Sequence, residues 1–383
     1  MFDKLPISSK TEKILTKSLD EPISVEEANH LMNIKGSDLY PLLATADHLR
    51  ETIVGNDVTF INNCNINFTN ICTVRCGFCA FGKDANDPEA YILDDDAILE
   101  KARGAAEKGA HEFCLMGGVL PDADIEYYEH LLHLLKGEFP DILIHGFSPT
   151  MVRDAAIVSG MDIEDAFRRL KVAGLDTLPG TAAEILTDRS REIICPEKVT
   201  TQEWIDIVNV AHEVGIPGSA TIMYGHVETL EERVEHIDII RKMQEDGGRF
   251  TEFIPMTFMH EFSPIFLDGA KNLGATGTED LKLYAVARLM LRDLIPNIQV
   301  SWVKMGFRFA QVSLSAGTND LGGTLGGDEL SAASGAPDGV EASIDTLNDI
   351  VENLGRNLIE RNSKYTEFYP LSFEEKMMAE SKI

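Results

Sequence analysis

Three cysteines lie close together in one short segment: Cys72, Cys76 and Cys79, with the spacing C-x3-C-x2-C. Thiolate sulfur is a soft ligand that suits iron–sulfur clusters, and a cubane cluster normally takes four such ligands. Three thiolates on one loop would hold three of the irons and leave the fourth iron without a protein ligand. The spacing therefore predicts a cluster whose open iron binds a further molecule.

The cysteines could also serve a structural zinc site or a disulfide framework. Structural zinc sites need four closed ligands, usually as two separated pairs, and the chain has no second C-x2-C or H-x3-H pair. A disulfide framework is disfavoured because six cysteines in 383 residues are few. Cys64, Cys114 and Cys195 stand apart from the triplet and are predicted to be ordinary buried thiols.

Composition limits the remaining possibilities. With 383 residues and 44% hydrophobic content, the chain can bury a large core as one big α/β domain or two ordinary ones. No apolar run approaches the ~20 residues of a membrane span, and the first residues lack a signal-peptide pattern, so we expect a cytoplasmic protein. The net charge of −29 predicts that neither nucleic acid nor an anionic membrane is a partner.

Strand-like and helix-like segments alternate through most of the chain. The predicted strands cover residues 58–68, 111–118, 141–147, 175–180, 219–225, 250–256, 297–302 and 320–325. The predicted helices between them cover residues 94–110, 125–139, 162–174, 200–215, 229–245, 278–294 and 306–316. Eight strand positions alternating with helices in this way predict an α/β protein with a (β/α)8 barrel of the TIM type.

The segments before and after the predicted barrel are expected to form separate parts of the structure. Residues 1–57 form an N-terminal helical cap, with helices at 24–34 and 38–53 expected to cover the base of the barrel. Residues 58–340 form the barrel with its cluster loop at 72–79, and residues 341–383 form a C-terminal helix and an extended tail. Within the barrel, the loop 326–341 is the best candidate for local mobility.

Polar and glycine residues follow the predicted strands, where TIM barrels place their chemistry. Each candidate also has a purely structural explanation: a glycine that turns the chain, a half-buried histidine, a carboxylate at a helix start or a core tryptophan. His212 and His236 lie within predicted helices and are expected at the surface. The candidates in chain order are Gly117, Gly118, His145, Ser148, Glu184, Arg191, Tyr224, His226 and Trp302.

The cysteine loop resembles that of the radical S-adenosylmethionine (SAM) superfamily. Within it, the chain resembles the tyrosine 4-hydroxyphenyl transferases that form the second subunit of the synthase for 7,8-didemethyl-8-hydroxy-5-deazariboflavin (FO), the chromophore of coenzyme F-420. The matching segments are NINFTNIC, GLDTLPGTAAEIL, ICPEKVTTQEW, ATIMYGHVET, FTEFIPMTF, NIQVSWVKMG and NDLGGTL.

The resemblance implies a 4Fe–4S cluster on the three cysteines, with SAM on the open iron. Reductive cleavage of SAM would give methionine and a 5′-deoxyadenosyl radical that takes hydrogen from L-tyrosine. The 4-hydroxybenzyl fragment would then join C5 of 5-amino-6-(D-ribitylamino)uracil, and 2-iminoacetate would leave. The implied partners are a low-potential donor such as ferredoxin or flavodoxin and the cyclising first subunit of the synthase.

The resemblance also divides the candidate residues between ligands. The candidates for the SAM side are Phe78, Gly117, Gly118, Glu184, Arg191 and Tyr224. The candidates for the catalytic, organic-substrate side are His145, Ser148, His226 and Trp302.

Other functions remain open at this stage. Two menaquinone-pathway enzymes, a dehypoxanthine futalosine cyclase and an aminofutalosine synthase, share the cysteine loop. They differ at residues 181–183, where they are glycine-rich, and the cyclase has tryptophan in place of Met256. Leu120 and the segment 326–329 depart from the transferase pattern. These departures concern the residues around the substrate opening, and the expected reaction is unchanged. The alternative of another class is a non-catalytic iron–sulfur or zinc-binding module.

Overall fold

The strands close into a ring of eight parallel positions, in a computed structural model that describes residues 7–271 and 273–371. Parallel bridges at residues 177–178 join β4 to β5, and bridges at residues 298–299 join β6 to β7. The (β/α)8 prediction is therefore confirmed. The ring strands are β1 (Asp57–Ile61), β2 (Asn63–Asn67), β3 (Glu112–Met116), β4 (Leu143–Gly146), β5 (Gly218–Tyr224), β6 (Phe250–Thr257) and β7 (Asp320–Gly323).

The first predicted strand, 58–68, is divided into β1 and β2, which share one position in the ring. β1 pairs with β7, whereas β2 pairs with β3 and is bridged at Cys64 to Gly326. Alternate residues of a strand point to opposite faces of the sheet. Asn63, Asn65 and Asn67 accordingly line the interior of the barrel, while Cys64 faces outward.

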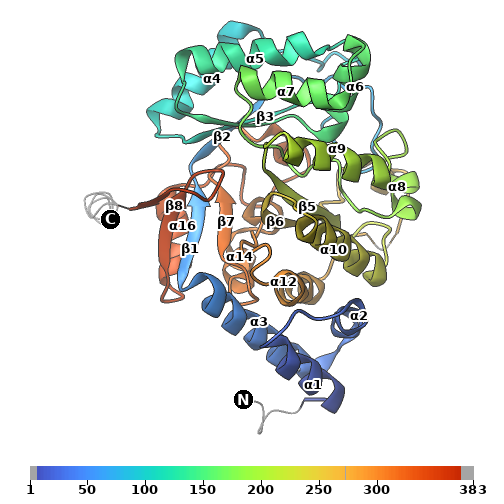
Figure 1. Cartoon of the computed structure of the whole chain (residues 1–383), viewed down its shortest axis with the longest axis vertical. Coiled ribbons are helices and arrows are strands. Elements are labelled where there is room, and N and C mark those ends of the chain that lie inside the picture. The colour runs from blue at the N-terminus through green and yellow to red at the C-terminus, as the bar shows by residue number, and fades with distance from the viewer. Residues whose placement is uncertain (1–6, 272, 372–383) are drawn as a thin grey trace.

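Helices surround the strands (Figure 1). Asp94 and Thr200 cap two of them, and Thr200 forms a capping box with Glu203. Helix α6 was not predicted, although Ser148 at its N-cap and Pro149 at its first position are a typical start signal. The larger helices are α4 (Asp95–Glu107), α5 (Ile125–Glu138), α6 (Pro149–Ser159), α7 (Ile163–Ala173), α9 (Thr201–Glu213), α10 (Leu230–Glu245) and α12 (Gly277–Leu291). Five shorter helices are α8 (Asp188–Ile194), α11 (Pro264–Leu267), α13 (Trp302–Met305), α14 (Phe307–Ser313) and α15 (Glu329–Ala333).

The N-terminal helices are α1 (Ser9–Ser18), α2 (Val25–Asn33) and α3 (Leu39–Val54), with a 3-10 turn, η1 (Gly36–Asp38), before α3. Helix α2 packs against α10 and α12, α3 packs against α12, and α1 packs against α2 and α3 (Figure 1). Lys282 of α12 donates to the carbonyl of Met32 at 2.6 Å, and Arg241 of α10 donates to the carbonyl of Ile23 at 3.0 Å. The N-terminal helices therefore support the outer helices on one side of the barrel. The base of the barrel is closed by the C-terminal segment.

The C-terminal segment differs most from its prediction. The predicted helix ends early, as α16 (Ile344–Glu352), and the chain continues as β8 (Asn357–Arg361) and β9 (Phe368–Pro370). β8 pairs in parallel with β1. Its last residue, Arg361, and the following turn, with Ser363 and Tyr365, reach the base of the barrel. The tail after residue 371 lies outside the described residues.

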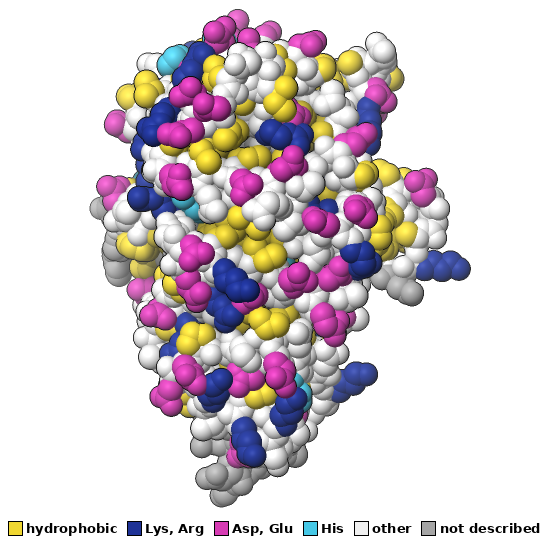
Figure 2. Space-filling model, turned by 45° about the vertical axis from the view of Figure 1, so that its right-hand side comes forward, with side chains coloured by type: hydrophobic (Ala, Val, Ile, Leu, Met, Phe, Trp, Pro, Cys, Tyr) yellow, Lys and Arg dark blue, Asp and Glu magenta, His cyan; other side chains and the backbone are white. Residues whose placement is uncertain are grey.

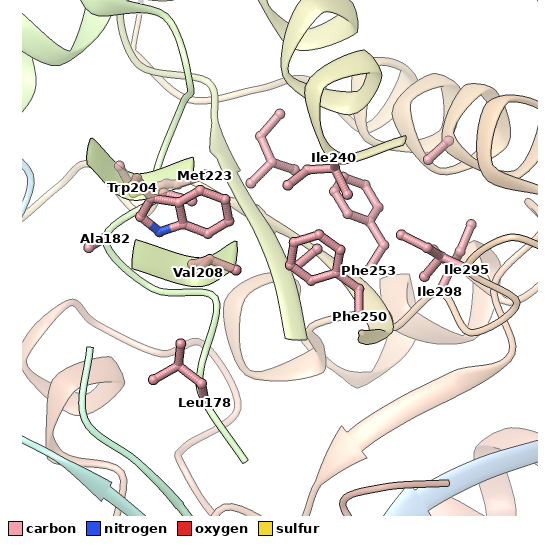
Figure 3. Packing of buried hydrophobic residues seen from close by; sticks show 14 of the residues in the cluster. Leu178, Ala182, Trp204, Val208, Met223, Ile240, Phe250, Phe253, Ile295 and Ile298 are labelled. Atoms are coloured by element: carbon pink, nitrogen blue, oxygen red, sulfur yellow. The ribbon is translucent and has the colours of Figure 1, made fainter. Parts of the chain in front are cut away.

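A hydrophobic layer between the strands and helices fixes the loop after the fourth strand position. Trp204 of α9 stacks nearly parallel on Phe250 of β6, with ring centroids 6.4 Å apart (Figure 3). The indole of Trp204 also donates to the carbonyl of Thr181 at 3.2 Å. This packing holds the segment that carries Ala182 and Glu184 against the barrel.

The surface is strongly acidic overall, in keeping with the net charge of −29. Figure 2 shows Asp and Glu side chains spread across one face, with Lys and Arg interspersed and small hydrophobic areas between them. Within residues 7–271 and 273–371, no helix combines the length and apolar character needed to cross a bilayer.

Candidate functional site

The three predicted cluster cysteines line one cavity of about 220 Å³ at the carboxyl end of the barrel. Backbone hydrogen bonds fix their loop on two sides. Cys72 N–H donates to the Lys83 carbonyl at 3.0 Å, and Gly77 N–H donates to the Ile194 carbonyl at 2.7 Å. These two hydrogen bonds tie the loop to neighbouring backbone.

The donor set in this cavity fits an iron–sulfur cluster. The three thiols are free, and the backbone N–H of Val119 donates to Cys72 Sγ at 3.3 Å. Burial raises the pKa of Cys76 to about 12, although the Lys198 ammonium opposes the rise. In the described ranges, no three His, Cys, Asp or Glu side chains converge as ligands of one metal ion. Three thiols in the wall of one cavity are the soft donor set that an iron–sulfur cluster takes.

Gly117 and Gly118 follow β3 and lie beside the cysteine loop, in the wall of the same cavity. A Cβ at Gly118 would come within 2.0 Å of the Ile71 carbonyl oxygen and 2.9 Å of Cys72 Cβ. A Cβ at Gly117 would lie 3.0 Å from the Thr69 carbonyl oxygen. The glycines are thus required because the cluster loop itself passes this close.

Glu184 and Lys198 form a buried ion pair in the cavity wall, with Lys198 Nζ 2.6 Å from Glu184 Oε1. Burial alone would raise the pKa of Glu184, but the nearby cations Lys198 and Arg191 outweigh it and lower the pKa. Glu184 has a φ of 43°, in the left-handed region that costs free energy for a residue other than glycine. The Glu184 carboxylate and the Lys198 ammonium place one charge of each sign beside the thiols, which suits the zwitterionic end of an amino-acid-like ligand.

A second cavity of about 230 Å³ fills the barrel interior below the first. Most of the residues that line it have polar side chains, among them the amides Asn63, Asn65, Asn67 and Gln299, and apolar side chains such as Ile254 and Met256 lie between them. Its charged lining residues are Glu112, Glu252, Lys304, Asp328 and Arg361. Five residues line both cavities and mark the junction between them: Met116, Thr181, Met256, Lys304 and Leu330.

Comparisons with known proteins agree with this arrangement. The family model of the radical SAM superfamily matches residues 66–240, and the model of the CofH/MqnC C-terminal region matches residues 247–373. The chain is 50% identical over 361 residues to the 5-amino-6-(D-ribitylamino)uracil–L-tyrosine 4-hydroxyphenyl transferase of Methanothermobacter thermautotrophicus, covering 94% of this chain and 98% of that protein. It is 44% identical to the transferase of that name from Methanopyrus kandleri, over 89% of this chain and 93% of that protein. The chain belongs to this transferase family.

Solved structures support the fold. A methylornithine synthase matches with a TM-score of 0.71 at 19% identity, covering 97% of this chain and all of that one (100%). The FeFe-hydrogenase maturase of Carboxydothermus hydrogenoformans matches with a TM-score of 0.74 at 16% identity, covering 94% of this chain and 81% of that one. This member of the family is therefore a radical SAM transferase built on a TIM-type barrel, and the family implies an iron–sulfur cluster and SAM.

In this transferase, some predicted residues reach the cavities. Phe78, Gly117, Gly118 and Glu184 line the cluster cavity, and Lys198 Nζ lies 5.0 Å from the centre of the Phe78 ring. His145 lines the lumen cavity, where its Nδ1 lies 2.8 Å from Thr177 Oγ1 and burial lowers its pKa. Ser148 was assigned to the organic-substrate side but lines the cluster cavity, because its hydroxyl caps α6 at that end of the barrel.

Four predicted residues line neither cavity. Arg191 of the transferase donates to the backbone carbonyls of Ala182, Ala183, Ile185 and Val199, so it clamps the loop that carries Glu184. The Tyr224 hydroxyl donates to Asp280 at 2.7 Å, outside the barrel lumen.

His226 and Trp302 also have structural partners. His226 Nε2 lies 2.9 Å from the Met223 carbonyl, and its Nδ1 accepts from Val227 N–H at 2.8 Å. The Trp302 indole donates to the Gly323 carbonyl at 3.0 Å and stacks on Phe307. The assignment of these two side chains to the substrate wall is not supported by their positions.

Sequence reasoning missed several cavity residues of the transferase. The alternating amides Asn63, Asn65 and Asn67 carried a usable signal, because their period of two places them on one face of a strand. Lys304 stood out as a lone charge in the segment WVKM. Arg361 carried no such signal, since it lies in the segment 341–383 that was predicted to be a helix and an extended tail outside the barrel.

Proposed function

We propose that this chain cleaves L-tyrosine between Cα and Cβ and joins the 4-hydroxybenzyl fragment to C5 of 5-amino-6-(D-ribitylamino)uracil, releasing 2-iminoacetate. The observation that carries the proposal is the junction of two cavities: a thiol-lined cavity at the barrel mouth continues into a polar lumen. A radical reaction between large substrates needs such an enclosed path, because the protein holds the reactants together and excludes water. The names of the nearly full-length relatives support the same reaction.

In this proposal, Cys72, Cys76 and Cys79 hold a 4Fe–4S cluster whose fourth iron binds SAM. When bound and reduced, the cluster and SAM supply the 5′-deoxyadenosyl radical. Gly117 and Gly118 keep the neighbouring loop close to the cavity wall, and the Glu184–Lys198 pair offers one charge of each sign to the amino-acid end of SAM. Phe78 contributes an aromatic face to the same cavity.

The lumen takes the two organic substrates. The diaminouracil has a polyhydroxylated ribityl chain and several ring donors and acceptors but no charged group. Amide and hydroxyl side chains suit it, and the lumen supplies them at Asn63, Asn65, Gln299, Ser301 and Ser363. Tyrosine lies nearer the junction, because its hydrogen is taken by the radical formed in the cluster cavity.

The proposal includes partners outside this chain. A low-potential donor such as ferredoxin or flavodoxin reduces the cluster, and the cyclising first subunit of the synthase takes up the coupled product. A cytoplasmic location suits an oxygen-sensitive cluster of this kind.

The test is product analysis with the anaerobically reconstituted enzyme. SAM and dithionite are supplied with either tyrosine and the diaminouracil or dehypoxanthine futalosine, in parallel. We expect 5′-deoxyadenosine and a tyrosine–uracil adduct in the first reaction and no cyclised product in the second. Turnover of the futalosine substrate, with no adduct from tyrosine, would contradict the proposal and favour the menaquinone pathway.

A further inference from the structure

Lys304 lies at the junction of the two cavities and lines both of them. It belongs to the short helix α13, which begins directly after the seventh strand position. Its Nζ donates to Ser331 Oγ at 3.1 Å. The ammonium group is therefore held at the point where the cluster cavity meets the substrate lumen.

The other cations of the two cavities already have carboxylate partners. Lys198 is paired with Glu184 at 2.6 Å, and Arg361 is paired with Asp320 at 2.7 Å and with Glu252 at 3.0 Å. Among the described residues, no carboxylate lies within ion-pair distance of Lys304, whose one hydrogen-bond partner there is a neutral hydroxyl. Burial lowers the pKa of Lys304, and the carboxylate of Asp328 only partly offsets this effect.

An ammonium group away from bulk water is unfavourable unless it is paired, so the junction favours an anionic ligand group. The diaminouracil carries no carboxylate or phosphate. Tyrosine carries an α-carboxylate next to the carbon atoms at which bonds change. SAM also carries a carboxylate, but its cavity has the Glu184–Lys198 pair for that end.

We propose that Lys304 binds the α-carboxylate of L-tyrosine and so places the Cα–Cβ bond at the junction of the two cavities. This assignment rests on the proposed function. In this role Lys304 determines specificity, because it distinguishes tyrosine from phenols that lack an α-carboxylate.

The test measures binding to the reconstituted enzyme with its cluster oxidised and SAM present, so that no turnover occurs. Equilibrium dialysis compares L-tyrosine with L-tyrosinamide, which keeps the ring and amine but lacks the negative charge. We expect the wild type to prefer L-tyrosine by at least about tenfold, the range of a charged hydrogen bond. Lys304→Met should bring the two affinities together, whereas Lys304→Arg should keep most of the preference.

Lys282→Met is the matched control, because Lys282 is a buried lysine that bonds to the Met32 carbonyl and lines neither cavity. It should keep the wild-type preference. An unchanged preference in Lys304→Met with normal iron content would overturn the proposal, as would a wild type that binds both compounds equally. Weaker binding of SAM alone would also overturn it and would assign Lys304 to SAM. Product analysis of the wild type tests the proposed reaction separately, since tyrosine binding is measured without turnover.

Discussion

Among single residues, the six cysteines differ in what their side chains face. Cys72, Cys76 and Cys79 share the cluster cavity. Cys64 lines a separate cavity on the outer side of β2, Cys114 lines the lumen and Cys195 is buried. Only the triplet is therefore placed to act together on one cluster.

Replacing any one of the triplet with Ala should abolish 5′-deoxyadenosine formation, because two thiolates cannot hold the cluster with one open iron. Cys64→Ala is the control and should retain both iron content and SAM cleavage. Iron content is measured after anaerobic reconstitution, and deoxyadenosine by chromatography. An essential Cys64 would show that the ligand assignment is wrong.

Gly118 tests how closely the cluster loop passes the glycine turn. Gly118→Ala places a Cβ against the Ile71 carbonyl, so the loop has to move, at an overpacking cost of about 1–3 kcal/mol. We expect lower iron content and a lower melting temperature in addition to weaker SAM binding. A side chain that only obstructed SAM would instead leave the iron content near normal.

Gly104→Ala is the control for this substitution. Gly104 lies within α4 with open space around its missing side chain, so Ala should raise stability by about 1 kcal/mol and leave iron content unchanged. Normal iron content and melting temperature in Gly118→Ala, with only SAM affinity reduced, would show that the added side chain obstructs SAM and does not displace the cluster loop.

At the level of elements, β8 and the turn after it close the barrel base through a buried polar network. Arg361 pairs with Asp320 and Glu252, and the Tyr365 hydroxyl donates to Glu252 at 2.5 Å. Burial raises the pKa of Glu252 to about 7; Arg361 opposes the rise and Asp320 adds to it. One guanidinium neutralises one carboxylate, so the second carboxylate tends to keep its proton.

This network predicts a pH dependence of stability. A carboxyl group whose folded pKa lies above its unfolded value favours folding most below the unfolded pKa, near 4.5, and this contribution is lost as the pH rises through about 7. The loss attributable to Glu252 is on the order of 3 kcal/mol. Chemical denaturation at about pH 5 and about pH 8 should show a smaller decrease for Glu252→Gln than for the wild type. Parallel decreases in the two proteins would contradict the assignment.

The sequence predicted the elements whose pattern is local. Alternating strands and capped helices gave the eight barrel positions, and the Thr200–Glu203 box marked the start of α9 correctly. The C-terminal β8 was missed because its strand character depends on pairing with β1, some 300 residues earlier in the chain. His212 and His236, expected at the surface, are buried, because α9 and α10 pack against strands and other helices on more than one side.

In the candidate site, too, residues with a local sequence pattern could be predicted, whereas side-chain directions that depend on distant packing could not. The cysteine triplet was identifiable because its spacing alone carries the chemistry. His226 and Trp302 follow the fifth strand and the seventh strand position as expected, yet both side chains turn into the protein rather than the lumen. Strand-end position limits where a residue lies, but neighbouring side chains and carbonyls decide which way it points.

At the level of the whole molecule, the barrel joins a thiol-lined mouth to a polar lumen that is closed at the base by the C-terminal segment. The outer surface is acidic overall, with Lys and Arg interspersed on the face shown in Figure 2, and the two cavities are lined by charges of both signs. This architecture places the thiol-lined cavity directly beside the lumen that is proposed to hold the organic substrates. In the proposed reaction, one tyrosine is divided between two products at the junction of these cavities.

The most direct measurement follows two labels from one tyrosine through a single reaction. Tyrosine with one isotope in the ring and Cβ and a second isotope at Cα is supplied with the diaminouracil, SAM and dithionite, and the products are analysed by mass spectrometry. We expect the ring and Cβ label in the uracil adduct and the Cα label in 2-iminoacetate, recovered as glyoxylate after hydrolysis. Both labels in one product, or deoxyadenosine formed without any division of tyrosine, would contradict it.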